Sequence, residues 1–368
     1  MARIFYSMAG EGRGHATRVR AIVEQLRGEH DFTLFAPAAA YEMLADAYAD
    51  THVRVLQIPG LMFHYTRQRM DYLKTMREAG SYLWQLPPLV QRLTSMIRHE
   101  RPDLVITDFD PALPRAAERC GVPYLSINHQ HFLVDCDLSS LPWRLRAATT
   151  WMAAVVRRFY QRQIETVISS FYFPPVLPNR HNVVQTGVLL RPEILTARPE
   201  RAGHLLVYLR RFASTKMLEA LKNCDRDVRI YGLGNRPRDG RLQFCQVDER
   251  TFLEDLGACD ALISNAGNQL VGEAIYLGKP VLAIPEAKNL EQSINAHFLR
   301  AEGGGDWVTA DQFDWPTLQN FLARIDQPRV VVNRHRMNGM PGVLAAIQRH
   351  LATDAAANFL KSRFQKVA

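Results

Sequence analysis

The chain has 368 residues, 47% of them hydrophobic, and carries 45 Lys and Arg against 37 Asp and Glu. This length suits two domains with full hydrophobic cores, so neither disulfides nor a structural metal are needed for stability. The five cysteines lie far apart without a CxxC pair, which argues against a zinc site and favours a reducing compartment. The charge excess divides into +4 in residues 1–190 (21 minus 17) and +4 in the rest (24 minus 20). Such dispersion excludes a basic tail, and we expect no nucleic-acid partner.

Strands and helices alternate through the first half of the chain. Apolar runs separated by turn residues predict strands, and helical spacing predicts helices between them. The predicted strands are 4–8, 31–37, 53–59, 103–111 and 123–129, and the helices include 16–26, 41–49 and 89–99. Strands this apolar indicate a parallel sheet covered on both sides. No run of about 18 apolar residues occurs and the N-terminus lacks the apolar core of a signal peptide, so we expect a cytoplasmic protein.

A basic stretch at 141–170 follows this series. It predicts one long helix with five arginines and two tryptophans, Trp143 and Trp151. Such a helix suits a membrane interface, which would make the protein peripheral on the inner face of the membrane. It also suits a core helix whose arginines stay in water, and this second interpretation is favoured.

The proline-containing segment 171–192 predicts an inter-domain connection, after which a second series begins. Its strands are predicted at 204–209, 226–234, 242–247, 261–267 and 280–285, and the tail at 341–364 has helical spacing. The sequence thus predicts two α/β domains in tandem. The N-terminal domain spans 1–185, the C-terminal domain spans 186–340, and a helix at 341–368 packs across the molecule.

The loop after the first strand is rich in glycine. Gly10, Gly12 and Gly14 let the backbone approach a ligand closely, and the helix that follows favours an anion at its N-terminus. The spacing is not the GxGxxG dinucleotide fingerprint, because the third glycine comes one residue early. His15 stands at this strand–loop–helix junction, where open α/β sheets bind ligands. A histidine at this point also serves as a cap or a packing residue.

The predicted partner of His15 is one of two aspartates at the end of a later strand, Asp108 or Asp110. A carboxylate bonded to one imidazole nitrogen fixes the tautomer and raises the basicity of the other nitrogen, as a general base for a sugar hydroxyl requires. Strand-end aspartates also serve as loop caps, so neither decides the chemistry alone.

The second half contains a small-residue turn that leads into a helix. We expect this helix to start near Asn268, with amides suited to phosphates. Glu273 lies within it, where a carboxylate can accept two hydrogen bonds from a vicinal diol. Glu291 and Gln292 follow a later strand end, where they would meet sugar hydroxyls.

This stretch resembles the donor-binding motif of the glycosyltransferase-B superfamily, particularly its UDP-sugar-dependent inverting branch. That branch includes glucuronosyltransferases and the lipid-linked N-acetylglucosaminyltransferase of cell-wall synthesis. The residues that carry the resemblance are Asn265-Ala266-Gly267, Glu273, Gly278-Lys279-Pro280, Glu291-Gln292 and Asn295, with Gly14, His15 and Arg18 in the first half. The resemblance implies two Rossmann-like domains that face each other across a cleft, with the C-terminal helix crossing back to the N-terminal domain.

The resemblance also implies a role for each residue and a reaction. His15 is the expected base with Asp108 as its orienter, and Gly14 belongs to the donor site. The nucleotide ribose is expected on Glu273, the diphosphate on Ala266, Gly267, Asn268 and Gln269, and the donor sugar on Glu291 and Gln292. A UDP-linked sugar would pass with inversion to an acceptor hydroxyl, lipid-linked or in the cell envelope. Helix amides and Arg210 or Arg211 would stabilise the leaving group, so no cofactor and no metal are expected.

The chain departs from the family pattern in two places. Asn265 stands where the family often has a histidine beside a phosphate, and Arg210 and Arg211 replace a glycine-rich turn. Arginine forks neutralise a diphosphate, so donor binding tolerates the change better than nucleotide identity does. Phe252 is the expected contact for the base, or else a core phenylalanine.

The acceptor side is the least determined by the sequence. His64, Asp110, His129 and His131 are the expected acceptor contacts, with ordinary polar loop residues as the alternative. Two other classes of function stay open: a nucleotide-sugar 2-epimerase, and a catalytically silent nucleotide-sugar sensor. Epimerases of this architecture lack the Gly-His loop, and a sensor has no need of a base, so a transferase fits best.

Overall fold

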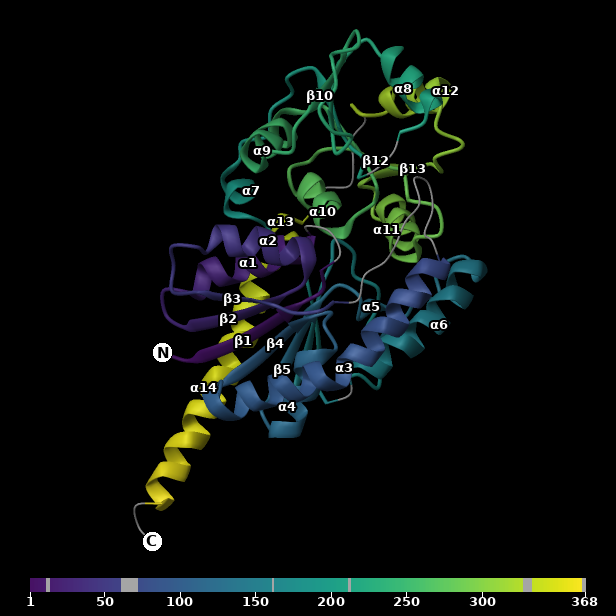
Figure 1. Cartoon of the computed structure of the whole chain (residues 1–368). Coiled ribbons are helices and arrows are strands. Elements are labelled where there is room, and N and C mark those ends of the chain that lie inside the picture. Colours follow the sequence, from purple (N-terminus) through teal and green to yellow (C-terminus); the bar gives the residue numbers. More distant parts are fainter. Residues whose placement is uncertain (11–13, 61–71, 161, 211–212, 327–332, 366–368) are drawn as a thin grey trace.

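The computed structural model describes residues 1–10, 14–60, 72–160, 162–210, 213–326 and 333–365. Within these residues the chain forms two parallel β-sheets, one in each half (Figure 1). The strand orders are β3-β2-β1-β4-β5-β6-β7 and β10-β9-β8-β11-β12-β13. Each order runs outward from its first strand in one direction and then in the other, which is the doubly wound pattern of a Rossmann-like domain. The predicted fold class is confirmed.

The N-terminal domain contains the first sheet and the helices around it. Its strands are β1 (Arg3–Met8), β2 (Asp31–Ala36), β3 (Arg54–Gln57), β4 (Leu104–Asp108), β5 (Tyr124–Asn128), β6 (Glu165–Ser169) and β7 (Val183–Thr186). Its helices are α1 (Gly14–Leu26), α2 (Ala38–Ala47), α3 (Tyr72–Glu100), α4 (Ala112–Cys120), α5 (Phe132–Asp135) and α6 (Trp143–Phe159).

The C-terminal domain repeats this arrangement. Its strands are β8 (His204–Tyr208), β9 (Asp227–Tyr231), β10 (Leu242–Cys245), β11 (Ala261–Ser264), β12 (Val281–Ala283) and β13 (Gly305–Trp307). Its helices are α7 (Pro192–Thr196), α8 (Thr215–Lys222), α9 (Glu249–Ala258), α10 (Asn268–Tyr276), α11 (Leu290–Ala301), α12 (Trp315–Leu322) and α13 (Arg334–Met337), after which α14 (Met340–Gln365) closes the chain.

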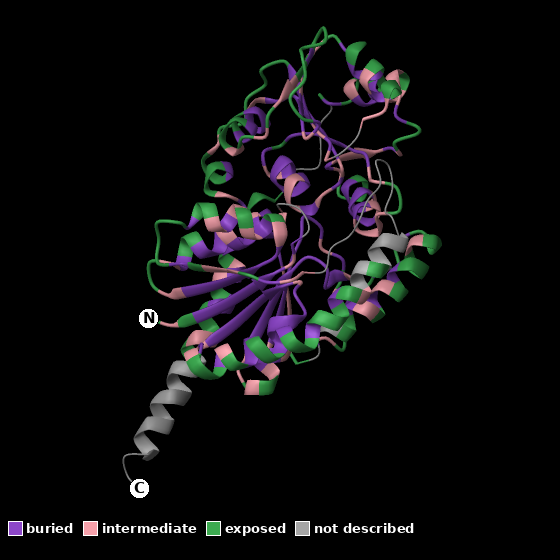
Figure 2. Cartoon of the chain, in the orientation of Figure 1, coloured by how far each residue is buried: buried purple, intermediate pink, exposed green. Residues whose placement is uncertain are grey.

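Both sheets are buried on both faces. On β1, Ile4 and Tyr6 belong to one hydrophobic cluster and Phe5, between them, belongs to another on the opposite face. On β8, Leu205 and Leu206 divide in the same way. Alternate side chains of a strand point to opposite faces, so this division shows helices packed above and below each sheet. Figure 2 shows the inner strands of the first sheet as almost entirely buried, whereas the edge strands β3 and β7 are only partly buried.

Helix α14, yellow in Figure 1, runs from the C-terminal domain back along the N-terminal domain. Val343 and Ile347 are fully buried in the cluster that contains Ile4 of β1. His350 Nε2 lies 2.8 Å from Glu165 Oε2 on β6. The crossing helix that the family resemblance implies is therefore present.

The prediction of one helix over 141–170 is wrong. The helix ends at Phe159, and Glu165–Ser169 forms β6, a buried strand of the first sheet. The run Thr166-Val167-Ile168 is β-branched and pairs with β5 and β7, which a solvated basic helix could not do. The predicted connection 171–192 likewise contains β7, and β13 was missed because its sequence, Gly305-Asp306-Trp307, lacks the apolar run that marks the other strands.

A helix that crosses a bilayer must be long and predominantly apolar. Within the part of the chain that the structure describes, no helix is both long enough and apolar enough to span a membrane.

Candidate active site

A cavity of about 350 Å³ lies between the two domains. Its walls come from segments that follow β1, β4 and β5 in one domain and β8, β11 and β12 in the other. These are the carboxyl ends of the parallel strands, where open α/β sheets bind ligands. A volume of this size suits a small organic ligand.

His15 lines this cavity and is paired with Asp108. The imidazole Nδ1 lies 3.0 Å from Asp108 Oδ1, and the Asp108 side chain has no exposed surface. Helix α1 starts at Gly14, so His15 stands in its first turn and Asp108 ends the neighbouring strand β4. The predicted meeting of these two side chains at the strand ends is present in the structure, and their catalytic roles stay a prediction.

Arg18 completes this cluster. Its Nη2 lies 2.8 Å from Asp108 Oδ1 and 2.9 Å from Oδ2, and the same atom lies 2.8 Å from His15 Nδ1. Burial would raise the pKa of Asp108, but the positive charge of Arg18 and the contact with His15 outweigh it and lower that pKa. Asp108 is therefore an anion at neutral pH, held between a guanidinium and an imidazole.

The N-terminal side of the cavity is largely apolar. The large apolar side chains in its wall are Met8, Met43, Phe109, Leu133, Met152 and Val156, beside the polar His15, Thr17, Arg18, Asp110 and Gln130. Phe109 has a φ of 62°, a strained value for a non-glycine residue that turns the chain sharply between Asp108 and Asp110. Asp110 lines the cavity as predicted, and its Oδ2 accepts a hydrogen bond from the Leu113 amide at 3.0 Å. Burial raises the pKa of Asp110.

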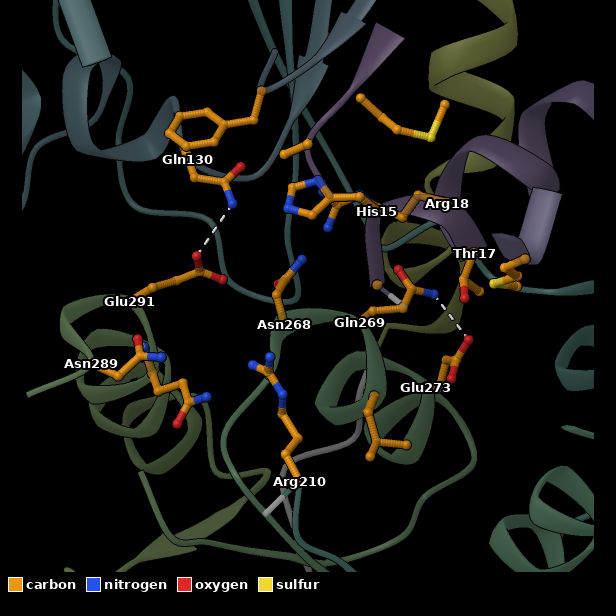
Figure 3. Close-up of a pocket in the computed structure, with 18 of the residues that line it drawn as sticks. His15, Thr17, Arg18, Gln130, Arg210, Asn268, Gln269, Glu273, Asn289 and Glu291 are labelled. Atoms are coloured by element: carbon orange, nitrogen blue, oxygen red, sulfur yellow. Dashed lines mark hydrogen bonds between the residues drawn. The ribbon is translucent and has the colours of Figure 1, made fainter. Parts of the chain in front are cut away.

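The N-terminus of α10 forms the opposite wall. Gly267, Asn268, Gln269 and Leu270 all line the cavity, and the N-cap residue of this helix, Gly267, has no side chain with which to cap it. The first amides of a helix lack intrahelical partners and carry the positive end of its dipole, so this wall favours an anion. Arg210 also lines the cavity, and Figure 3 shows its side chain on the side opposite His15.

Asn265 and Ala266 lie behind this wall. Asn265 accepts a hydrogen bond from the Arg210 amide at 2.9 Å and donates one to Ile284 O at 3.0 Å, so it links the ends of β8, β11 and β12. Ala266, with a φ of 36°, is 1% exposed, and its carbonyl accepts a hydrogen bond from Asn295. Neither lines the cavity, in contrast to the position expected for a diphosphate contact.

Glu273 lines the cavity with its side chain already paired to an arginine. Arg191 Nη2 lies 2.6 Å from Glu273 Oε2 and Arg191 Nε lies 2.9 Å from Oε1. Gln269 Nε2 donates to the same Oε1 at 2.9 Å (Figure 3). Arg191 also reaches Glu249 at 3.1 Å. From the sequence, Arg191 was placed only in the connecting segment. No local pattern indicates its pairing with Glu273, which lies 82 residues away.

Glu291 and Gln292 line the cavity from the start of α11. Glu291 Oε2 accepts a hydrogen bond from Gln130 Nε2 at 3.2 Å, which bridges the two domains (Figure 3). Gln292 is 5% exposed and its side chain bonds the backbone and the carboxylate of Glu286. Gln130 was not predicted, although it lies between two histidines that were.

Two of the predicted acceptor contacts lie away from the cavity. His129 is fully buried, and its Nε2 lies 3.0 Å from Asn295 Oδ1 in the other domain. His131 is 2% exposed, and its Nδ1 lies 2.8 Å from Asn128 Nδ2. Burial lowers the pKa of both imidazoles, that of His131 to about 3. Both follow a buried strand and turn inward, so they serve packing and domain contact here.

The remaining predicted residues divide into two groups. Phe252 belongs to the core, where its ring packs edge-on against Tyr208 and Tyr231, and it also lines the cavity. His64 and Arg211 lie outside the residues that the structure describes. In the described ranges no cluster of three His, Cys, Asp or Glu side chains has metal-binding geometry.

Known proteins share the sequence pattern and the architecture of this chain. The model of glycosyl transferase family 1 matches residues 2–326. An uncharacterized glycosyltransferase of Methanosarcina mazei is 23% identical over an alignment of 333 residues. The alignment covers 82% of this chain and 85% of the relative. The calicheamicin glycosyltransferase CalG4 superposes with a TM-score of 0.64 at 16% identity, over 100% of this chain and 99% of its own. Arabidopsis thaliana UGT89C1, in complex with UDP-L-rhamnose, gives 0.65 at 16% identity, over 96% and 99%. At such identities the two solved structures establish the fold alone.

Proposed function

Because this chain belongs to glycosyl transferase family 1, it is a glycosyltransferase, and we propose that it transfers a sugar from a UDP-sugar to an acceptor hydroxyl with inversion. The observation that carries the proposal is the His15–Asp108 pair at the cavity, opposite the uncapped N-terminus of α10. A base and an anion site on two sides of one cavity are what a single displacement requires.

The proposed reaction is one displacement at the anomeric carbon. His15 donates Nδ1–H to Asp108, so the lone pair of Nε2 is available to take the proton of the acceptor hydroxyl. The acceptor oxygen then bonds to the anomeric carbon as the bond from that carbon to the diphosphate oxygen breaks. The leaving nucleotide takes the electron pair of the broken bond. Attack from the face opposite the leaving group inverts the configuration.

The leaving diphosphate is proposed to sit at the start of α10. The amides of Asn268 and Gln269 and the side chain of Arg210 supply positive charge on that wall of the cavity. These groups support a transfer without a bound metal. Activity that is unchanged by an excess of chelator is expected, and loss of activity that added Mg²⁺ or Mn²⁺ restores would contradict this part.

The donor is proposed to carry UDP, since UGT89C1, which shares the fold, is known in complex with UDP-L-rhamnose. Thermal unfolding in the presence of single nucleotides and nucleotide sugars tests this directly, because a ligand that binds the native state raises the melting temperature. UDP-linked ligands should raise it more than ADP- or GDP-linked ones. Equal shifts from all three nucleotides would contradict UDP specificity.

His15→Ala tests the base. We expect it to lower transfer by about 10²–10⁴-fold, with the thermal shift produced by the donor unchanged. Near wild-type transfer in this variant would contradict the assignment. Incubation of the wild-type protein with the donor alone separates the alternatives: an epimerase changes the sugar configuration, a transferase at most releases UDP slowly, and a silent sensor does neither.

The acceptor is proposed to be lipid-linked. The N-terminal wall of the cavity is apolar, and Met152 and Val156 in that wall belong to α6. On α6, Trp143 and Trp151 are 67% and 68% exposed, the guanidinium of Arg144 lies over the Trp143 ring, and Arg157 is exposed near the end of the helix. Exposed tryptophans with arginines on one helix suit the interface of an anionic membrane, so we propose that α6 contacts the inner face of the membrane.

Flotation with liposomes tests the membrane contact. Wild-type protein should float with anionic vesicles at low salt and less with neutral vesicles, because arginines contribute electrostatic attraction. Trp143→Ser/Trp151→Ser should reduce the floating fraction. The control, Arg238→Gln/Arg250→Gln, removes exposed charges from the C-terminal domain and should leave flotation unchanged. Absence of wild-type protein from the anionic lipid fraction would contradict the contact.

A further inference from the structure

Arg18 is a buried cation that the general-base reaction does not use. It stands one helical turn after His15 on α1 and is 5% exposed. Its guanidinium contacts both oxygens of Asp108, through Nη2 at 2.8 and 2.9 Å and through Nε at 3.2 Å. Figure 3 shows it directly behind His15. The carboxylate that orients His15 is therefore itself oriented by an arginine fork.

Nδ1 of His15 has two neighbours of opposite charge. Asp108 Oδ1 lies 3.0 Å away and Arg18 Nη2 lies 2.8 Å away. Nδ1 either donates its hydrogen to the carboxylate or accepts one from the guanidinium, and only the first leaves Nε2 free to act as a base. The fork on Asp108 keeps Oδ1 aimed at Nδ1, which favours the first arrangement.

Other ionisable groups among the described residues lie near this cluster. Tyr6 of β1 is fully buried, and burial raises the pKa of its hydroxyl well above the usual value, so it stays neutral. Glu291 of α11 attracts Arg18 electrostatically, and Gln130 donates a hydrogen bond to its carboxylate. Among the residues that the structure describes, Arg18 and Asp108 are the charged groups within hydrogen-bond distance of Nδ1.

We propose that Arg18 is a positioning residue: it orients Asp108 so that the neutral ring of His15 keeps its proton on Nδ1. Nε2 then keeps the lone pair that a base needs. The inference rests on the proposed function in one respect, the assignment of His15 as the base.

Nitrogen-15 NMR of histidine side chains tests the proposal without any substrate, because the shifts of the two ring nitrogens report tautomer and protonation. His15→Gln identifies the signals of His15. In Arg18→Met, the Nδ1–H tautomer of His15 should become less populated, because Asp108 loses the guanidinium that aims its Oδ1 at Nδ1. The matched control is Arg20→Met on the same helix, which removes the same charge from a partly exposed pair with Glu249 and should leave the tautomer of His15 unchanged.

Arg18→Lys keeps the test available if Arg18→Met does not fold. It retains a positive charge and loses the fork, so the Nδ1–H tautomer should become less populated in this variant as well. An Nδ1–H population in Arg18→Met equal to that in Arg20→Met, or a wild-type His15 protonated on Nε2, would overturn the proposal. Failure to transfer sugar would contradict the proposed function and leave these measurements valid.

Discussion

Histidines near the cavity differ in chemistry because they differ in burial and in partners. His15 is 8% exposed and lines the cavity, where its ring can meet a ligand. His129 and His131 follow β5 and turn into the protein, where neutral rings satisfy buried polar groups. The same side chain can thus meet a ligand in one place and serves packing in the other.

Replacement of His131 should reduce the acid sensitivity of the fold. Above about pH 6.5 this side chain is neutral in the folded and the unfolded chain. Its pKa in the folded protein is lowered to about 3, so between these values only the unfolded chain binds the proton. The free energy of unfolding then falls by about 1.4 kcal/mol for each pH unit of acidification.

Urea unfolding at pH 7, 6 and 5 measures this slope. We expect His131→Gln to lack the part of the slope that belongs to His131, whereas the exposed His52→Gln serves as the control. Parallel slopes in wild type and His131→Gln would show that His131 takes up its proton in the native state.

At the scale of elements, Arg191 joins the connecting segment to two helices of the C-terminal domain, α9 and α10. It bonds Glu273 on α10 through two nitrogens and Glu249 on α9 through a third. Glu249 also forms an ion pair with Arg20 of α1, at 2.9 Å. This network of charged side chains therefore extends to the helix that carries His15. The wall opposite His15 is therefore tied to α1 by ion pairs as well as by packing.

Loss of Arg191 should cost far more stability than loss of Arg20. Arg191→Ala leaves Glu273, which has no exposed surface, as a buried carboxylate with Gln269 as its remaining side-chain donor. Removal of one partner from a buried pair costs about 3–5 kcal/mol. Arg20→Ala breaks a pair that is over one-third exposed on both sides, and such pairs contribute less than about 1 kcal/mol. Equal losses in urea unfolding would contradict this ranking.

Helix α10 also packs closely on the connecting segment. A Cβ added at Gly272 would lie 2.4 Å from Val188 Cγ1, which is fully buried. Gly272→Ala should therefore destabilise the protein by about 1–3 kcal/mol through overpacking. Gly272→Ala/Val188→Ala restores the space, so the double variant should be more stable than the sum of the two single losses predicts. Additive losses would show that the contact relaxes without cost.

At the scale of the whole molecule, a buried interface behind the cavity joins the two domains. Asn295 of α11 accepts a hydrogen bond from Tyr172 at 2.9 Å and contacts His129 at 3.0 Å, and both partners come from the N-terminal half. Tyr172 also stacks on Phe298 with ring centroids 4.2 Å apart. Polar groups without exposure need these bonds, so the interface fixes how the two halves of the site face each other.

Asn295→Ala tests this coupling. It removes the partner of His129 and Tyr172 and the donor to Ala266 O, and each unsatisfied buried group costs about 1–3 kcal/mol. We expect a lower free energy of unfolding and weaker donor binding, because Ala266 belongs to the turn before α10. Ser293→Ala on the same helix, whose hydroxyl bonds its own helix backbone, is the control and should change neither. Wild-type donor affinity in Asn295→Ala would contradict the coupling.

The sequence by itself determined the two-domain architecture and the pair at its centre. Apolar runs and glycine turns are local patterns, and local hydrogen bonding makes strands and helices from them, so ten strands were predicted in their observed order. The meeting of His15 with Asp108 also followed, because the ends of parallel strands share one edge of a sheet. Strands β7 and β13 were not predicted, because neither contains an apolar run long enough to show the alternation of a strand.

Only the tertiary structure decided which polar residues face the cavity. Arg191 meets Glu273 across 82 residues, Arg18 meets Asp108 across 90, and His129 meets Asn295 across 166. Such pairs depend on where the chain brings distant segments together, and no spacing along the sequence encodes them. The same reason separates His15, which faces the cavity, from His129 and His131, which burial removes from it.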